Sequence, residues 1–297
     1  MLQDRSAVID FGVLPPTPGM IAGGVYQQPA RAEAFARTCG FEPPAGLRSM
    51  SVDALIADMD EAGVSTAVIR GRQQAASLDG AVVSEPFAPS SLSAEESRTL
   101  MSERPGRFVA YAGVNEGMLD DPAKALDPVL SDERFRGVML SPGYFKRPLY
   151  ADDPRLSVLY DYCRTRALPT MINFGGNSGP DLSYTNPEII DRVAARFPDL
   201  PLVVHHGGWP WVTQILHVAF RRTNVYLAPD QHLYGFPGWR DYVEAGNGFL
   251  RDRLLYASYY PFLPIPSSAE RFRTMFDEEV HARLLHDNAQ HLLSLRS

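Results

Sequence analysis

This sequence has few cysteines, no long apolar run and no excess of positive charge. Among 297 residues only Cys39 and Cys163 are cysteines, far apart and outside any CxxC pair, which argues against a disulfide framework or a zinc knuckle. No apolar run approaches the roughly 20 residues that a membrane-spanning helix needs. The formal net charge is -7, whereas a general nucleic-acid binder carries a basic patch. Nucleic acid and membrane are therefore poor partner candidates.

The start of the chain also lacks a targeting signal. Its first six residues, MLQDRS, contain neither the basic region nor the apolar region of a secretory signal, so we expect a cytoplasmic protein. Hydrophobic residues make up 45% of the chain and charged residues 21%. This composition supplies enough apolar material for one large buried core and argues against disorder.

Short β-branched runs alternate with amphipathic helical stretches along almost the whole chain. Eight runs have strand character, and the helical patterns between them predict βα units around a parallel sheet. They span residues 7–14, 65–71, 108–114, 136–141, 170–174, 202–206, 225–229 and 254–258. Eight units favour a closed (β/α)8 barrel, an α/β fold, over an open doubly wound sheet. We predict one barrel domain over residues 1–297.

Two of the intervening helices have clear end signals. Ser51 is a suitable N-cap for a helix that ends at Gly63, and Asn186, which precedes a proline, marks a second start. Such helices are expected to cover the outside of the barrel. The Pro/Gly-rich stretches 15–46 and 72–91 predict long loops after the first and second strands. Loops of this length often form lids or subunit contacts.

A pair of histidines at a strand end is the most informative motif. The run LVVHH at 202–206 is followed by GGWPW, so histidine stands before a glycine turn and a helix, where a barrel places its chemistry. Successive side chains of a strand point to opposite faces, so only one of His205 and His206 is expected to enter the barrel mouth. A histidine at this place could also simply hydrogen-bond its own turn.

This motif resembles the sixth-strand HGG-P-W segment of the amidohydrolase-related family that includes aminocarboxymuconate semialdehyde decarboxylase and the resorcylate decarboxylases. Other segments resemble landmarks of that family in the same order. They are VID at 8–10, RGVML at 136–140, PTMIN at 169–173, LYASYYPF at 255–262 and LHDNA at 285–289. The resemblance spans nearly the whole chain and implies the same barrel fold. It selects His206 as the acid/base histidine.

The sequence departs from the family pattern at the metal ligands. Family members usually bind a divalent metal through an HxH pair on the first strand, a histidine on the fifth and an aspartate on the eighth. The corresponding positions here are Gly12, Leu14, Asn173 and Tyr259. Glycine and leucine cannot coordinate a metal, and amide and phenol oxygens are weak substitutes for imidazole and carboxylate. The resemblance therefore implies that the usual metal cage is lost.

The loss of this cage leaves three interpretations of different classes. The first, which we favour, is an enzyme that works without metal, for which a lactonase on the same scaffold is a precedent. The second is a metal enzyme whose site has moved to a group such as His206, Asp230 and His232. The third is a non-catalytic relative that binds a ligand. The fold alone does not decide among them.

Polar residues at other strand ends complete the candidate catalytic set. Asp230 follows the seventh strand, beside the strand that carries His206, and can orient the imidazole; an aspartate that caps its own turn is the alternative. Asn173 and Tyr259 occupy former ligand positions. There they can donate hydrogen bonds to an oxygen that gains charge, or merely fill the vacated volume.

Three residues are candidates for substrate binding. Arg70 and Arg72 close the second strand, and we expect only one of them to point inward readily. Arg72, nearer the loop, is the better candidate to clamp a carboxylate, with a solvated arginine as the alternative. Ser141 and Tyr144 follow the fourth strand and can contact the substrate.

These observations lead to a prediction of function. We predict a small-molecule hydrolase or carbon-carbon lyase that acts on a compact carboxylated or oxygenated ring compound, with His206 as acid or base. No cofactor is predicted, and a divalent metal such as zinc is the alternative. The family is commonly oligomeric, and the long first loop is rich in Pro, Tyr and Phe, so we also expect a homo-oligomer.

Overall fold

The fold is built around a sheet of seven parallel strands that follow one another in chain order. The computed structural model describes residues 7–73 and 91–296. The strands are β1 (Val8–Val13), β2 (Val64–Arg70), β5 (Phe108–Gly113), β6 (Phe135–Leu140), β7 (Thr170–Asn173), β8 (Leu202–His205) and β9 (Val225–Ala228). Each agrees with a predicted strand to within one residue at either end. The first seven predicted strands are therefore confirmed.

The eighth predicted strand closes the barrel without forming a regular ladder. Leu254 forms a bridge to β9 and Tyr260 forms a bridge to β1, so the segment joins the two edges of the sheet. The amide of Tyr256, however, donates to a carbonyl of the C-terminal helical segment, and that of Ser258 donates to the Asp10 side chain. Because the acceptors of these amides are not backbone carbonyls of the neighbouring strands, a regular strand does not form. The (β/α)8 fold itself is confirmed.

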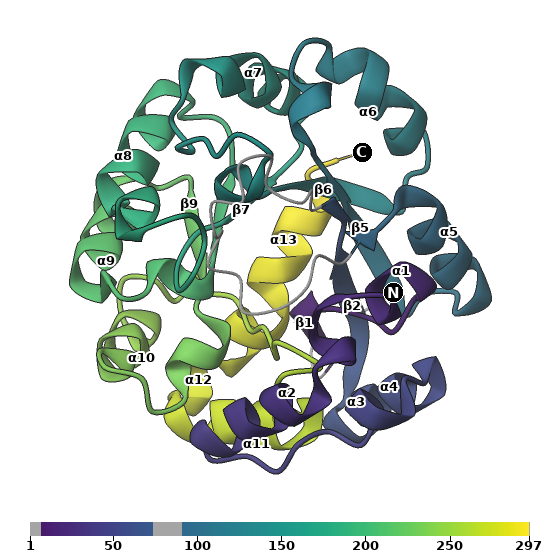
Figure 1. Cartoon of the computed structure of the whole chain (residues 1–297). Coiled ribbons are helices and arrows are strands. Elements are labelled where there is room, and N and C mark those ends of the chain that lie inside the picture. The colour runs from purple at the N-terminus through teal and green to yellow at the C-terminus, as the bar shows by residue number, and fades with distance from the viewer. Residues whose placement is uncertain (1–6, 74–90, 297) are drawn as a thin grey trace.

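Helices surround the sheet on its outer side (Figure 1). The Ser51 hydroxyl accepts from an amide in the first turn of α4, which ends at Gly63 in the left-handed conformation that glycine adopts freely. Asn186 caps α8 in the same way, so both predicted helix ends are confirmed. The α-helices are α1 (Pro18–Ile21), α2 (Pro29–Thr38), α3 (Gly46–Ser49), α4 (Val52–Ala62), α5 (Ala94–Glu103), α6 (Pro122–Leu130), α7 (Ser157–Thr165), α8 (Pro187–Arg196), α9 (Val212–Arg221), α10 (Trp239–Asn247), α11 (Ile265–Met275), α12 (Glu278–Ala282) and α13 (Asn288–Ser294).

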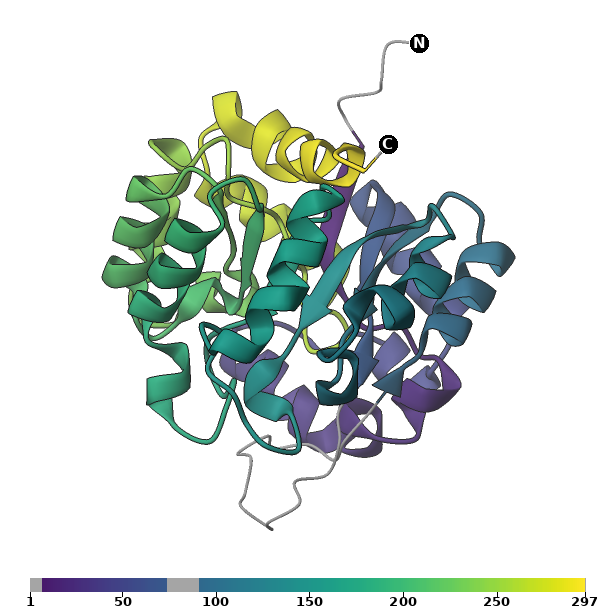
Figure 2. The same cartoon turned by 90° about the horizontal axis from the view of Figure 1, so that it is seen from above.

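The buried apolar side chains form two clusters. The larger one lies between the sheet and the helices, and the smaller one fills the inside of the barrel with residues such as Val68, Met171 and Val203. Leu292 and Leu293 of α13 join the inner cluster. Helix α13 crosses the end of the barrel at which the strands begin (Figures 1 and 2). One end of the barrel is thus closed, which leaves the carboxyl ends of the strands for chemistry.

The structure describes the whole of the first predicted long loop, 15–46, and only the ends of the second, 72–91. Between β1 and α4 the chain forms α1, the short helix η1 (Gly24–Gln27), α2 and α3. After β2, the short strands β3 (Arg72–Gln73) and β4 (Ser91–Leu92) pair in antiparallel orientation, and most of the loop predicted at 72–91 lies outside the described residues. Both cysteines are buried free thiols. Within 7–73 and 91–296, no helix has the length and apolarity to cross a membrane.

Candidate active site

A cavity of about 310 Å³ lies at the carboxyl ends of the barrel strands. Residues at or just after the ends of β2, β6, β7 and β8 line its inner part, and the loop after β1 contributes a wall from α2. The polar residues that line it are Arg31, Arg70, Ser141, Tyr144, Asn173, Asn177, Ser178, His205, His206, Gln231, His232 and Tyr259. The polar strand ends predicted from the sequence therefore meet in one place, where barrel enzymes carry out their reactions.

Both histidines of the HHGG motif face this cavity. The period of two along β8 places His205 on the same inward face as Val203. His206 has a left-handed φ of 65°, and this turn brings its ring beside that of His205, with 3.6 Å between the ring centroids. The expectation that only one of them enters the barrel mouth is wrong. The alternation on which it depended ends with the strand at His205.

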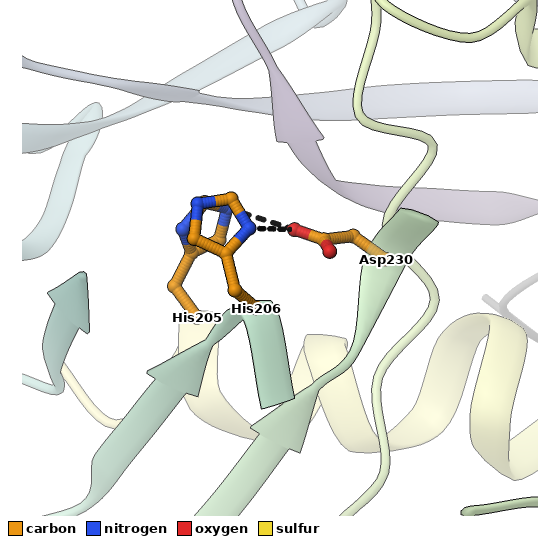
Figure 3. Close-up of side chains that lie close together, drawn as sticks. All are labelled: His205, His206 and Asp230. Carbon is orange, nitrogen blue, oxygen red and sulfur yellow. Dashed lines mark ion pairs between the residues drawn. The ribbon is translucent and has the colours of Figure 1, made fainter. Parts of the chain in front are cut away.

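Asp230 lies against both imidazoles (Figure 3). Its Oδ2 atom is 2.7 Å from Nδ1 of His206 and 3.2 Å from Nε2 of His205. A third imidazole, that of His232, has Nδ1 3.4 Å from the other carboxylate oxygen. Asp230 is fully buried and follows β9, the neighbour of β8. The structure thus brings together the pair that the strand order predicted.

The surroundings of Asp230 favour its ionised form. Burial raises the pKa of Asp230. The charge and hydrogen bond of His206, together with the His232 contact, lower this pKa by more than burial raises it, to about 2. Burial lowers the pKa of His232. An ionised Asp230 accepts the proton on Nδ1 of His206, which leaves Nε2 of that ring as the proton acceptor. None of the described residues hydrogen-bonds to this Nε2.

Asn173 and Tyr259 both line the cavity. The Asn173 side-chain oxygen accepts a hydrogen bond from the Ser178 hydroxyl at 3.2 Å and lies 3.3 Å from Nδ1 of His205. The Tyr259 ring meets the His206 ring edge to face, with 5.3 Å between centroids. Both side chains are therefore near enough to the imidazoles to contact the same small substrate.

Arg70, the other of the two arginines considered above, lies in the cavity, and the role predicted for Arg72 stays a prediction. The Arg70 side chain is 3% exposed, lines the cavity and contacts the His205 ring, with 3.2 Å from a terminal guanidinium nitrogen to Nδ1. The signal was available, because Val68 faces the barrel interior and Arg70 is two residues further along β2. The preferred candidate, Arg72, begins β3 instead, and its side chain lies outside the described part of the structure.

Ser141 and Tyr144 also line the cavity. The Tyr144 hydroxyl donates to the Asn177 carbonyl, which ties the segment after β6 to the loop after β7. A hydroxyl used in this way can still accept a hydrogen bond from a substrate. Their role in substrate binding stays a prediction.

Two cavity histidines and the buried Asp230 behind them carry the donor atoms that a divalent metal ion requires. One ligand atom from each of His205, His206 and Asp230 can be chosen so that all lie within 4.8 Å of one another. Two imidazoles and a carboxylate suit zinc and related divalent ions. The residues present therefore fit a metal at a relocated site, with His205 in place of the His232 proposed from the sequence. This fit favours the metal alternative over the prediction of no cofactor.

Barrel enzymes have their active sites at the carboxyl ends of the strands, and this cavity, which histidines and other polar side chains line, lies there. The protein therefore belongs to the class of (β/α)8 barrel enzymes. The sequence profile described as amidohydrolase matches residues 27–295, so the chain belongs to the amidohydrolase family. The prediction of an enzyme of this superfamily, a hydrolase or lyase, is confirmed at that level. The solved structure of an uncharacterized TIM-barrel protein, Bb4693 from Bordetella bronchiseptica, is 35% identical with a TM-score of 0.88, covering 98% of this chain and 99% of that one.

Two decarboxylase structures are similar at lower identity. The 2,6-dihydroxybenzoate decarboxylase from Rhizobium is 16% identical with a TM-score of 0.64, covering 98% of this chain and 99% of that one. The 5-carboxyvanillate decarboxylase from Novosphingobium aromaticivorans, complexed with manganese and 4-hydroxy-3-methoxy-5-nitrobenzoic acid, is 15% identical with a TM-score of 0.64, covering 98% and 97%. These likenesses show the shared fold. No curated protein matches the sequence.

Proposed function

We propose that this protein is a hydrolase or carbon-carbon lyase that acts on a compact carboxylated or oxygenated ring compound, with His206 as the acid or base. The observation that carries the proposal is the 2.7 Å contact between His206 and a fully buried, ionised Asp230. A carboxylate on one ring nitrogen orients the imidazole and leaves the other nitrogen to move a proton. The same arrangement recurs in hydrolases of unrelated folds.

The remaining cavity residues have complementary roles in this proposal. Asn173 and Tyr259 donate hydrogen bonds to the oxygen that gains charge, a task that preorganised donors perform well in a cavity shielded from water. Arg70 binds an anionic group of the substrate, because a guanidinium pairs with a carboxylate through two parallel hydrogen bonds. The decarboxylases with the same fold are named for carboxylated phenols, which supports the choice of substrate class.

The proposal is tested by product formation in a screen of lactones, amides and aromatic acids. Positioned acid/base groups typically contribute about 10²–10⁴-fold to a rate, so His206→Asn is expected to lower turnover by about that factor. Its melting temperature should stay close to that of the wild type. His217→Asn on α9, outside the cavity, is the matched control. Full activity of His206→Asn would refute the acid/base assignment, and absence of any turnover would favour a non-catalytic binding protein.

A second candidate keeps the substrate class and adds a divalent metal ion. The cluster of His205, His206 and Asp230 would hold it, and the manganese in the 5-carboxyvanillate decarboxylase structure supports this choice of ion. A bound ion would act as a Lewis acid on a substrate oxygen. The three side chains would hold it from one wall of the cavity.

Metal titration separates the two candidates. Protein dialysed against a chelator is titrated with Mn²⁺ by calorimetry, and activity is measured before and after. The metal candidate requires one bound equivalent, loss of binding in Asp230→Ala, and activity that disappears with the metal and returns with it. Undiminished activity in the chelated protein would leave the His206 mechanism as the supported one. The expected homo-oligomer stays a prediction that light scattering can test.

A further inference from the structure

The cavity also has an aromatic lining beside its polar residues. Four aromatic side chains form it, which we call the aromatic rim: Phe35, Trp209, Phe236 and Phe262. The first three are only partly buried, so their rings keep apolar surface exposed in the cavity. Exposed apolar surface is costly in water, and a cavity lined with it is suited to an apolar group of a ligand.

The rim joins parts of the chain that are distant in sequence. Phe35 on α2 lies 5.9 Å from Phe262 and 6.3 Å from Phe236 between ring centroids, so the loop after β1 meets the loops after β9 and the eighth strand. Trp209, which follows β8, contacts Phe236 at 5.3 Å. Its indole N–H donates to the Pro237 carbonyl at 3.2 Å, which fixes the orientation of the ring. The rim is therefore held in place by its own contacts.

Trp209 also connects the rim to the catalytic group. Its ring stacks on the His232 ring, with centroids 5.0 Å apart and an interplanar angle of 11°, and His232 in turn lies beside Asp230. A substrate whose reacting end contacts His206 would therefore extend along this wall toward the rim. The cavity of about 310 Å³ falls at the lower end of the range found for drug-sized ligands. It has room beyond a single ring.

We infer that the aromatic rim is a subsite for a second aromatic ring, so that the substrate is an acid with two rings. The inference rests on the proposed function for the placement of the reacting end near Arg70 and His206. Aromatic rings prefer offset-stacked or edge-to-face contacts at 4.5 to 7 Å, so four aromatic side chains that line one cavity suit an aromatic ligand group. A single-ring acid held by Arg70 and His206 would not use these contacts.

Binding of three probes tests the subsite: benzoate, biphenyl-3-carboxylate and biphenyl-4-carboxylate. We expect at least one biphenyl acid to bind about tenfold tighter than benzoate, a difference of about 1.4 kcal/mol. Phe35→Ala and Phe236→Ala should reduce this advantage to about threefold or less, while benzoate affinity changes by less than about twofold. Calorimetry measures the affinities, and melting temperatures verify that the variants are folded. Phe35→Leu keeps an apolar side chain if the alanine variant fails to fold.

Phe220→Ala is the matched control for loss of a phenylalanine. Phe220 is 60% exposed on α9, contacts Phe249 and is not among the residues lining the cavity. Failure of both biphenyl acids to bind tighter than benzoate would overturn the subsite, as would an advantage that survives in both rim variants. A rim-dependent advantage together with full activity of His206→Asn would instead overturn the acid/base proposal and leave the subsite standing.

Discussion

The imidazole rings of His205 and His206 lie on the same wall of the cavity, 3.6 Å apart between centroids, although the residues are consecutive. In a continuing strand they would point to opposite faces. Here β8 ends at His205, and the left-handed backbone of His206 turns the second ring back toward the first. One carboxylate, that of Asp230, can therefore contact both rings, and this relationship underlies both candidate mechanisms.

Asp230→Asn is expected to lower turnover by about tenfold or more, but by less than His206→Asn does. The amide no longer favours the tautomer with the proton on Nδ1, although the imidazole that moves the proton remains. Steady-state kinetics on the substrate found in the screen measures the effect. Asp241→Asn, on the exposed surface of α10, is the control. A loss equal to that of His206→Asn would show that Asp230 does more than orient the ring.

Arg70→Lys is expected to weaken benzoate binding by about tenfold despite the retained charge, because lysine cannot form the paired contact of a guanidinium. Arg72→Lys is the informative comparison, because nearness to the loop favoured Arg72, whereas the structure places Arg70 in the cavity. Equilibrium binding and melting temperatures are measured for both variants. Weaker binding in Arg72→Lys alone would return the anion-binding role to the residue first predicted.

Asp10→Ala is expected to destabilise the protein by about 3 kcal/mol, because it leaves two buried amides without an acceptor, at a cost of about 1 to 3 kcal/mol each. One carboxylate oxygen of Asp10 accepts from the amides of Gly12 and Ser258, each at 2.9 Å, so the side chain ties the end of β1 to the segment before Tyr259. Asp10→Asn keeps a carbonyl oxygen for these amides and should cost much less. Urea unfolding of both variants at pH 7 measures the difference.

The pH dependence of stability supplies a separate test of Asp10. Burial raises the pKa of this carboxyl above 3.8, against the hydrogen bonds from Ser258 and Gly12, so the folded state holds the proton more tightly than the unfolded state. The stabilisation from this group is complete below the unfolded pKa and is lost as pH rises through the folded pKa. Asp10→Asn should lack this part of the dependence. Parallel unfolding profiles for the two proteins from pH 3 upward would contradict the assignment.

The barrel strands could be predicted because their signals are local. Short β-branched runs marked seven strands to within one residue, and the caps at Ser51 and Asn186 marked two helix starts. The eighth segment was predicted less well, because the acceptors of its amides, such as Asp10, lie far away in the sequence. Local patterns carry no information about such partners.

Part of the site was predictable for the same reason. Asp230, Asn173 and Tyr259 stand at the ends of barrel segments, and a barrel gathers such ends at one mouth. The inward direction of His205 could also have been derived by continuing the period of two from Val203. His206 could not be placed by alternation, since its direction depends on a backbone turn outside the strand.

The sequence by itself determined the family and the barrel. Only the tertiary structure decided which side chains share the mouth. It placed three imidazoles around Asp230 and assembled the aromatic rim from four distant segments. Strand periodicity is set by neighbouring residues, whereas contacts across the barrel mouth depend on loop paths that form only when the sheet closes.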